Sequence, residues 1–158
     1  MAVVAATMLS VLAACNDDEI SSLPESDGSY ALYGTWATCQ VGDFRNAITF
    51  NPSGTATQSV VSFTSTDGSC SGTPGTPGTG TLSFSIGNPI TVSWFGNSVS
   101  GRELNINIGG TITYTSYFIN GASEPYTLYV ADENPPNDGS TPALRSKTME
   151  TNMFFYRQ

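Results

Sequence analysis

The chain has 158 residues, a net charge of -8, and five basic residues that are spread along it, at Arg45, Arg102, Arg145, Lys147 and Arg157. Because the basic residues form no cluster, we expect no binding to nucleic acid through charge. The length is that of one domain, and a sequence without histidine excludes a Ser-His-Asp triad and most transition-metal sites.

The first 14 residues, MAVVAATMLSVLAA, form an apolar run without a charged side chain. The run is shorter than the ~20 residues that span a bilayer, but it fits the apolar core of a signal peptide. It leads into Leu12-Ala13-Ala14-Cys15, which resembles the lipobox of bacterial lipoproteins. The resemblance implies cleavage before Cys15 and acylation of Cys15, which would anchor the protein in a lipid bilayer. The alternative interpretation is a buried strand or helix with a core cysteine.

The lipobox resemblance also implies a location and a domain order. The location is the bacterial cell envelope, with the folded domain on the extracytoplasmic side, in the periplasm or at the cell surface. Residues 1–14 would be the signal peptide. Residues 15–29 would be the lipidated cysteine and an acidic, serine-rich tether, and residues 30–158 the folded domain.

The chain has three cysteines, and assigning Cys15 to lipid leaves Cys39 and Cys70 as a pair. Export to an oxidising compartment would allow these two thiols to form a disulfide. A zinc site is the alternative, but two thiols without histidine supply few ligands. We therefore expect a disulfide, which would close a loop of about 30 residues and contribute ~3 kcal/mol.

From residue 30 onward, apolar and polar residues alternate between turn residues, which predicts short strands. In RELNINI, residues 102–108, Leu104, Ile106 and Ile108 face one way. The Gly109-Gly110 pair after them is typical of a hairpin turn. The strands are expected at residues 34–40, 47–50, 55–65, 81–86, 102–108, 111–119, 126–130 and 152–157. Residues 71–80 and 131–147 are expected to be long connections.

This pattern predicts an all-β domain of about eight antiparallel strands. Short connections between successive strands favour an up-and-down barrel, which also removes exposed sheet edges. A two-sheet sandwich is the alternative.

The first predicted strand begins with Gly34-Thr35-Trp36, which resembles the G-x-W signature of lipocalins. In that family the tryptophan caps one end of the barrel and an arginine near the end of the last strand lies across its ring. The resemblance implies that role for Arg157. The chain also resembles a group of small bacterial lipocalin-like lipoproteins. The parts that match are Gly34 to Trp36, Cys39, the AITF strand ending at Phe50, and Cys70.

No residue pattern in the sequence indicates catalysis. The sequence has no nucleophile elbow and no glycine-rich phosphate loop, and Glu103 is the one acid inside a clear strand. Because Glu103 lies on the polar face, a solvated side chain is expected. We therefore predict no enzymatic activity, no catalytic residue and no cofactor.

The sequence also raises a calcium site. Five oxygen-bearing side chains occur at Asp132, Glu133, Asn134, Asn137 and Asp138. Their spacing fits no EF-hand loop and two prolines split them, so a solvated acidic loop is favoured and no metal is assigned.

The aromatic residues of the predicted strands have two interpretations. They would fill a small barrel, or they would line a pocket for a small apolar ligand, and a filled core is favoured. The possible lining residues are Phe50, Trp94, Tyr114, Phe118, Tyr126 and Phe155. The predicted function is binding of a small apolar ligand by a membrane-anchored barrel. The alternative is a structural or interaction protein with a solid barrel, whose protein partner the sequence does not name.

Overall fold

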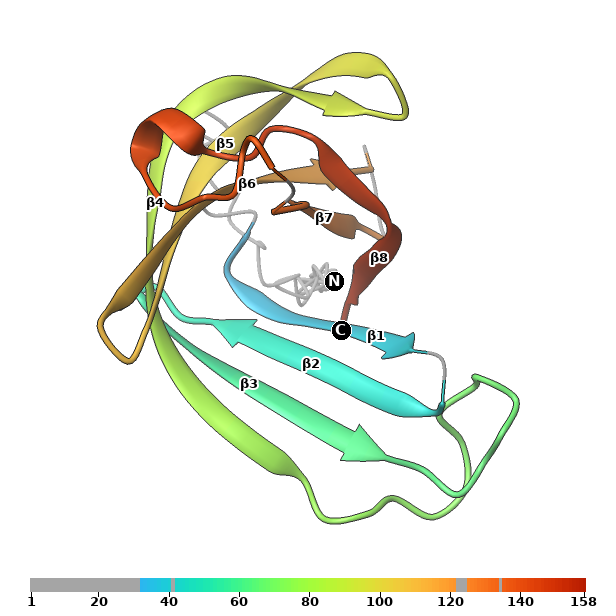
Figure 1. Ribbon diagram of the computed structural model, residues 1–158. Coiled ribbons are helices and arrows are strands. Elements are labelled where there is room, and N and C mark those ends of the chain that lie inside the picture. The colour runs from blue at the N-terminus through green and yellow to red at the C-terminus, as the bar shows by residue number, and fades with distance from the viewer. Residues whose placement is uncertain (1–31, 41, 122–124, 134) are drawn as a thin grey trace, which may run out of the picture.

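The computed structural model describes residues 32–40, 42–121, 125–133 and 135–158 (Figure 1). The predicted signal peptide, Cys15 and the acidic tether lie outside these residues. The described chain forms a closed barrel of eight antiparallel strands, in which each strand pairs with the next and β8 pairs with β1. This confirms the predicted up-and-down barrel, and the chain does not form the alternative sandwich.

The strands follow one another along the chain with one short helix between the last two. They are β1 (Gly34–Gln40), β2 (Phe44–Phe50), β3 (Thr55–Ser62), β4 (Gly78–Trp94), β5 (Asn97–Ile108), β6 (Thr111–Asn120), β7 (Thr127–Ala131) and β8 (Met149–Arg157), with the 3-10 helix η2 (Pro142–Leu144) before β8. Within the described ranges, no helix is long and apolar enough to cross a membrane.

Strand β4 is longer than the sequence predicts, with 17 residues. It begins at Gly78, inside the Gly/Pro/Thr-rich segment that was expected to be a loop, and it continues past Ile86 to Trp94. The register shifts between Ile86 and Pro89, which marks a β-bulge. Strands tolerate proline at a bulge. Gly87 and Pro89, which in sequence suggest a turn, therefore lie within one continuous strand and bend it.

The barrel interior contains the main hydrophobic core. Side chains alternate between the two faces of each strand, and the inward-facing set packs into one cluster. Its buried members are Leu32, Trp36, Phe50, Ala56, Phe84, Leu104, Tyr117, Leu128 and Phe155. Ile48 and Ile106 pack against this cluster, so the inward pattern predicted for RELNINI places Leu104 and Ile106 correctly.

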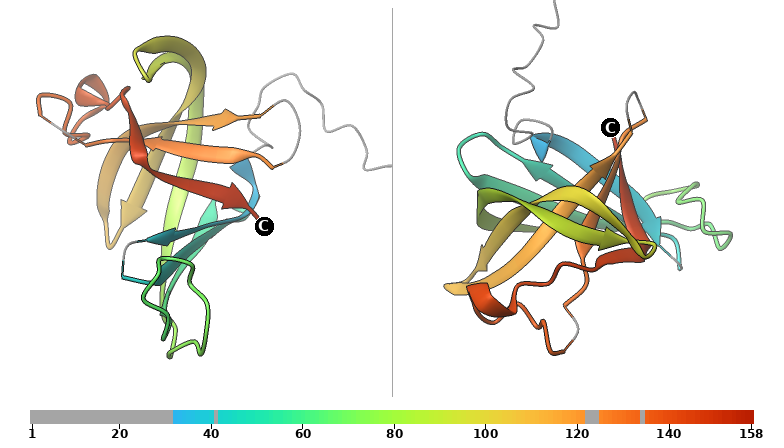
Figure 2. Two further views of the ribbon diagram at one scale, coloured as in Figure 1. Left: turned by 90° about the vertical axis from the view of Figure 1, so that its right-hand side faces the viewer. Right: turned by 90° about the horizontal axis from the view of Figure 1, so that it is seen from above.

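A second cluster lies on the outer face of the barrel. Beyond the bulge, the β4–β5 hairpin bends away and packs over β6, β7 and β8 (Figures 1 and 2). Gly101 permits the close approach, because a Cβ there would lie 2.6 Å from the carbonyl oxygen of Tyr117. The cluster contains Val92, Tyr129, Ala131 and Met149, with Ile90, Trp94, Val99, Phe118 and Phe154 packed against it.

Candidate functional site

Trp36 and Arg157 lie at the end of the barrel where β1 begins and β8 ends, which we call the closed end. Trp36 is fully buried, and its indole Nε1 donates to the carbonyl oxygen of Leu32 at 2.7 Å. The guanidinium carbon of Arg157 is 5.6 Å from the centroid of the Trp36 ring, and Nη2 donates to the carbonyl of Tyr33 at 3.1 Å. Gly34 has a φ of +117°, and a Cβ there would lie 3.3 Å from Nη2 of Arg157. Glycine therefore leaves room for this guanidinium.

The opposite end carries the connections from β1 to β2, β3 to β4, and β5 to β6, and we call it the open end. Inward-facing side chains become more exposed toward it. On β2, exposure rises from 2% at Phe50 to 45% at Phe44, and on β8 from 8% at Phe155 to 41% at Met153. Val60, which faces inward on β3, is 38% exposed. Between the two ends, the inward side chains are partly buried, as at Ile48, Leu82, Ile106 and Val130. The interior is thus packed at one end and accessible to solvent at the other.

The inward-facing side chains toward the open end are uncharged: Phe44, Val60 and Met153 are apolar, while Gln40, Asn46, Gln58 and Ser62 are polar. Among these polar side chains, Gln58 Nε2 donates to Asn46 Oδ1 at 3.1 Å. Gly80 pairs with Gln58 in the β3–β4 ladder, and a Cβ added at Gly80 would meet no atom within 4 Å. The position therefore faces open space. Uncharged walls that carry apolar side chains at Phe44, Val60 and Met153 suit an uncharged ligand with apolar surface.

The connection from β7 to β8 covers the outer face of β5 and β6 through Arg145, which is buried. Its Nη1 donates to the carbonyl of Leu104 at 3.1 Å and also to the carbonyl of Thr115. Its Nη2 donates to Asn105 Oδ1 at 2.8 Å, and its Nε lies 3.5 Å from Glu103 Oε1. Glu103 is therefore paired beneath this connection, whereas the sequence predicted a solvated carboxylate.

The disulfide between Cys39 and Cys70 is confirmed, with a Cα–Cα distance of 5.8 Å. It links β1 to the connection between β3 and β4. Asp43, a residue that the sequence analysis missed, is fully buried beside it. Its carboxylate accepts from the Ser65 hydroxyl at 2.6 Å and from the backbone N–H groups of Cys70 at 3.0 Å and Gly68 at 3.2 Å.

These hydrogen bonds, with the Ser65 hydroxyl as the largest effect, hold the pKa of Asp43 below its ordinary value. Both sulfur atoms close to Asp43 belong to the disulfide, so they are not thiolate ligands for a metal.

The aromatic residues proposed as pocket lining occupy three places. Phe50, Tyr126 and Phe155 belong to the interior core or pack against it. Trp94 and Phe118 lie in the outer cluster, with ring centroids 5.3 Å apart. Tyr114 lies under Arg145, whose guanidinium carbon is 5.6 Å from the ring centroid. The six residues therefore do not line one common pocket, because neighbouring residues of a strand face opposite sides.

The acidic connection after β7 includes two carboxylates whose local contacts differ. Asp138 accepts from the backbone N–H of Ser140 at 3.0 Å, which lowers its pKa. Partial desolvation raises the pKa of Glu133, and the nearby charge of Asp132 raises it further. Asn134 lies outside the described residues, and Glu133, Asn137 and Asp138 are exposed.

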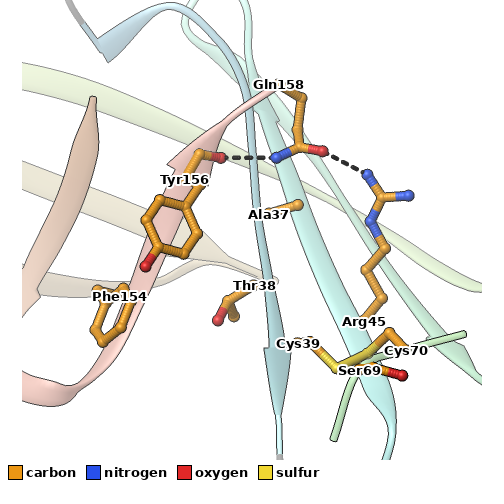
Figure 3. Close-up of a pocket in the computed structure, with 9 residues that line it drawn as sticks. All are labelled: Ala37, Thr38, Cys39, Arg45, Ser69, Cys70, Phe154, Tyr156 and Gln158. Carbon is orange, nitrogen blue, oxygen red and sulfur yellow. Dashed lines mark hydrogen bonds between the residues drawn. A yellow bond between two sulfur atoms is a disulfide. The ribbon is translucent and has the colours of Figure 1, made fainter. Parts of the chain in front are cut away.

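A groove of about 510 Å³ lies on the outside of the barrel, where β8 meets β1 (Figure 3). Phe154 and Tyr156 form one wall, and their ring centroids are 5.4 Å apart. The disulfide and Ser69 line the other side. Arg45 lies at this side too, and its Nη2 donates to Gln158 Oε1 at 2.7 Å. The groove could not be predicted from the sequence, because its residues come from three distant segments of the chain.

Comparison of the chain with protein-family models, with curated protein sequences and with solved structures gives no match.

Proposed function

We propose that this chain is a lipid-anchored protein of the bacterial cell envelope whose lipocalin-like barrel binds a small apolar molecule at its open end. The observation that supports binding is the gradient of exposure along the inward faces, from 2% at Phe50 to 45% at Phe44. Side chains that merely filled a solid barrel would be buried at both ends. The binding role requires no catalytic group and no cofactor.

The binding site is tested by filling the open end from Gly80. A phenylalanine at this position points inward into space where a Cβ meets no atom within 4 Å, so the backbone need not move. We expect Gly80→Phe to weaken binding of the neutral apolar dye N-phenyl-1-naphthylamine at least tenfold, measured by its fluorescence.

The matched control is Thr81→Phe, because Thr81 is the next residue on β4, is exposed, and faces the outside of the barrel. It should leave dye binding unchanged. Equal dye affinity in the two variants would contradict a site at the open end.

The anchor is tested at Cys15, because the lipobox resemblance makes this thiol the site of acylation. Cys15→Ser should abolish incorporation of radiolabelled palmitate and move the protein from the membrane fraction to the soluble fraction. Cys39→Ser is the control, because it also removes a cysteine, and it should leave labelling intact. Label in Cys15→Ser protein would overturn the anchor.

The alternative function, a structural or interaction protein with a solid barrel, is supported by the tight packing of Trp36, Phe50 and Leu104 at the closed end. Native mass spectrometry of protein purified from its own host separates the two functions. A co-purifying small molecule that Gly80→Phe removes supports the binding protein. An empty barrel in both proteins favours the alternative.

A further inference from the structure

The seam between β1 and β8 closes the barrel over a short length. The ladder contains the pairs Trp36↔Arg157 and Ala37↔Tyr156, and Gln158 N donates to Thr35 O at 3.0 Å beside them. By contrast, β1 pairs with β2 over its whole length, from Gly34 to Gln40. Figure 3 shows β8 and β1 separating beyond Ala37.

The backbone groups next in line along the seam point into the gap between the strands. Gln158 N donates to Thr35 O, so the backbone carbonyl of Thr35 points toward β8. Because the peptide groups of every second residue of a strand point the same way, those of Ala37 and Cys39 also point toward β8. On β8, Arg157 N donates to Tyr126 O beside β7, so Phe154 faces β1. Cys39 and Phe154 lie beyond the last pair of the described ladder. Unpaired strand edges of this kind are templates for an added strand.

Side chains bridge the two strands where the ladder has stopped. Gln40 Nε2 lies 3.1 Å from the sulfur of Met153. We expect this contact to be displaced at small cost, because both side chains are neutral and have several rotatable bonds. Displacing this contact would leave the packing at the closed end in place, because neither side chain belongs to the core cluster there.

The outer groove lies above this seam. Its aromatic and charged side chains would contact the side chains of a bound segment. Tyr156, which is 45% exposed, and Phe154 present aromatic surface on the β8 side. Arg45 supplies a positive charge on the other side, and its hydrogen-bond partner is the neutral amide of Gln158. Among the described residues that line the groove, none is acidic. A carboxylate on the occupant would complement Arg45, while the net charge of -8 disfavours a strongly acidic occupant.

We propose that the seam binds an extended peptide segment of a partner protein as an added strand, with an apolar side chain on Phe154 and Tyr156 and a single carboxylate on Arg45. The free backbone edge favours a peptide over a saccharide, because a saccharide offers no repeating amide pattern to pair with Cys39 and Phe154. This site is separate from the open end proposed above for an apolar ligand.

The experiment uses a fluorescein-labelled peptide of sequence Thr-Val-Thr-Phe-Thr-Glu-Thr and fluorescence anisotropy with the full domain. We expect saturable binding, and slower hydrogen exchange at the amides of Cys39 and Phe154. N-methylation of alternate peptide amides should abolish binding, because it removes the strand hydrogen bonds and keeps the side chains. The same peptide with Gln in place of Glu should bind about tenfold more weakly.

Two pairs of variants locate the binding. Arg45→Gln should weaken binding about tenfold, whereas Lys147→Gln, which removes an equal charge at another exposed position, should not. Tyr156→Ala should weaken binding, whereas Ile112→Ala, at a comparably exposed apolar residue, should not. Gly80→Phe should leave peptide binding intact, so failure at the open end and failure at the seam are distinguishable.

Three results would overturn the proposal. They are equal binding of the N-methylated and parent peptides, equal binding to Arg45→Gln and Lys147→Gln, and unchanged exchange at the amides of Cys39 and Phe154 on saturation. Protection of the same amides by self-association without peptide would assign the seam to a second copy of this chain. Competition by maltohexaose would assign it to a saccharide.

Discussion

At the residue scale, two buried charged side chains hold the long connections against the barrel. Asp43 gathers the segment that carries Cys70, and Arg145 fastens the connection between β7 and β8. Neither residue differs in sequence from an ordinary loop aspartate or arginine. Their roles arise because carbonyl and amide groups converge on them only in the folded chain, so the sequence could not predict them.

Asp43 makes its connection sensitive to acid. Its pKa lies below the ordinary value of 3.8, chiefly because of the Ser65 hydroxyl, so the ionised form is favoured in the folded state. Its contribution to stability is therefore complete above the ordinary pKa and is lost as pH falls through the lowered one. We expect the amides of Gly68 and Cys70 to lose protection against hydrogen exchange in that acidic range, after correction for intrinsic rates.

The variant Asp43→Asn should show low protection of these two amides even at neutral pH. Asp138→Asn is the control, because that carboxylate bonds within another connection, to Ser140. Exchange at Gly68 and Cys70 that is the same in Asp43→Asn and the unsubstituted protein would refute the role of the carboxylate.

At the scale of elements, the alternation of apolar and polar residues predicts a strand correctly where a recognisable turn also marks the end of that strand. It succeeds for β1, whose predicted bounds, 34–40, are those observed. It fails for β4, because Gly87 and Pro89 suggest a turn, while the structure uses them at a bulge where Glu103 lies close to Gly87. For the aromatic residues, the sequence allowed a filled core or a pocket and favoured the filled core. It could not predict which of them face inward, and Trp94 and Phe118 face outward.

Among the residues that join elements of the fold, we expect Arg145 to contribute most to the free energy of unfolding. Arg145→Met would leave the carbonyls of Leu104 and Thr115 without this donor and Glu103 without its ion pair. We expect the free energy of unfolding to fall by about 2–4 kcal/mol, measured by urea denaturation. Arg45→Met, at an exposed arginine, should cost less than about 1 kcal/mol. Similar losses in both variants would show that Arg145 contributes no more than a surface arginine.

At the scale of the whole molecule, one sheet serves two cores. Its inner face packs around Trp36 and Leu104, while the bent β4–β5 hairpin covers the outer face at Tyr129. This second layer buries aromatic side chains that a simple up-and-down barrel would expose to solvent. This hairpin leaves the outer face of β1 and the end of β8 uncovered, where Tyr156 is 45% exposed, and the groove lies there.

The β1–β8 ladder has the fewest pairs of any in the barrel among the described residues, so we expect the sheet to open there first. Arg157 supports this ladder through the Trp36 ring and the Tyr33 carbonyl, contacts worth about 2 kcal/mol together. In Arg157→Ala, native-state hydrogen exchange should therefore show the amides of Ala37 and Tyr156 opening at a free energy about 2 kcal/mol lower, while the amide of Leu104 changes less. Arg45→Ala should leave all three unchanged. An equal loss at Ala37, Tyr156 and Leu104 would mean instead that the seam opens only when the entire barrel unfolds.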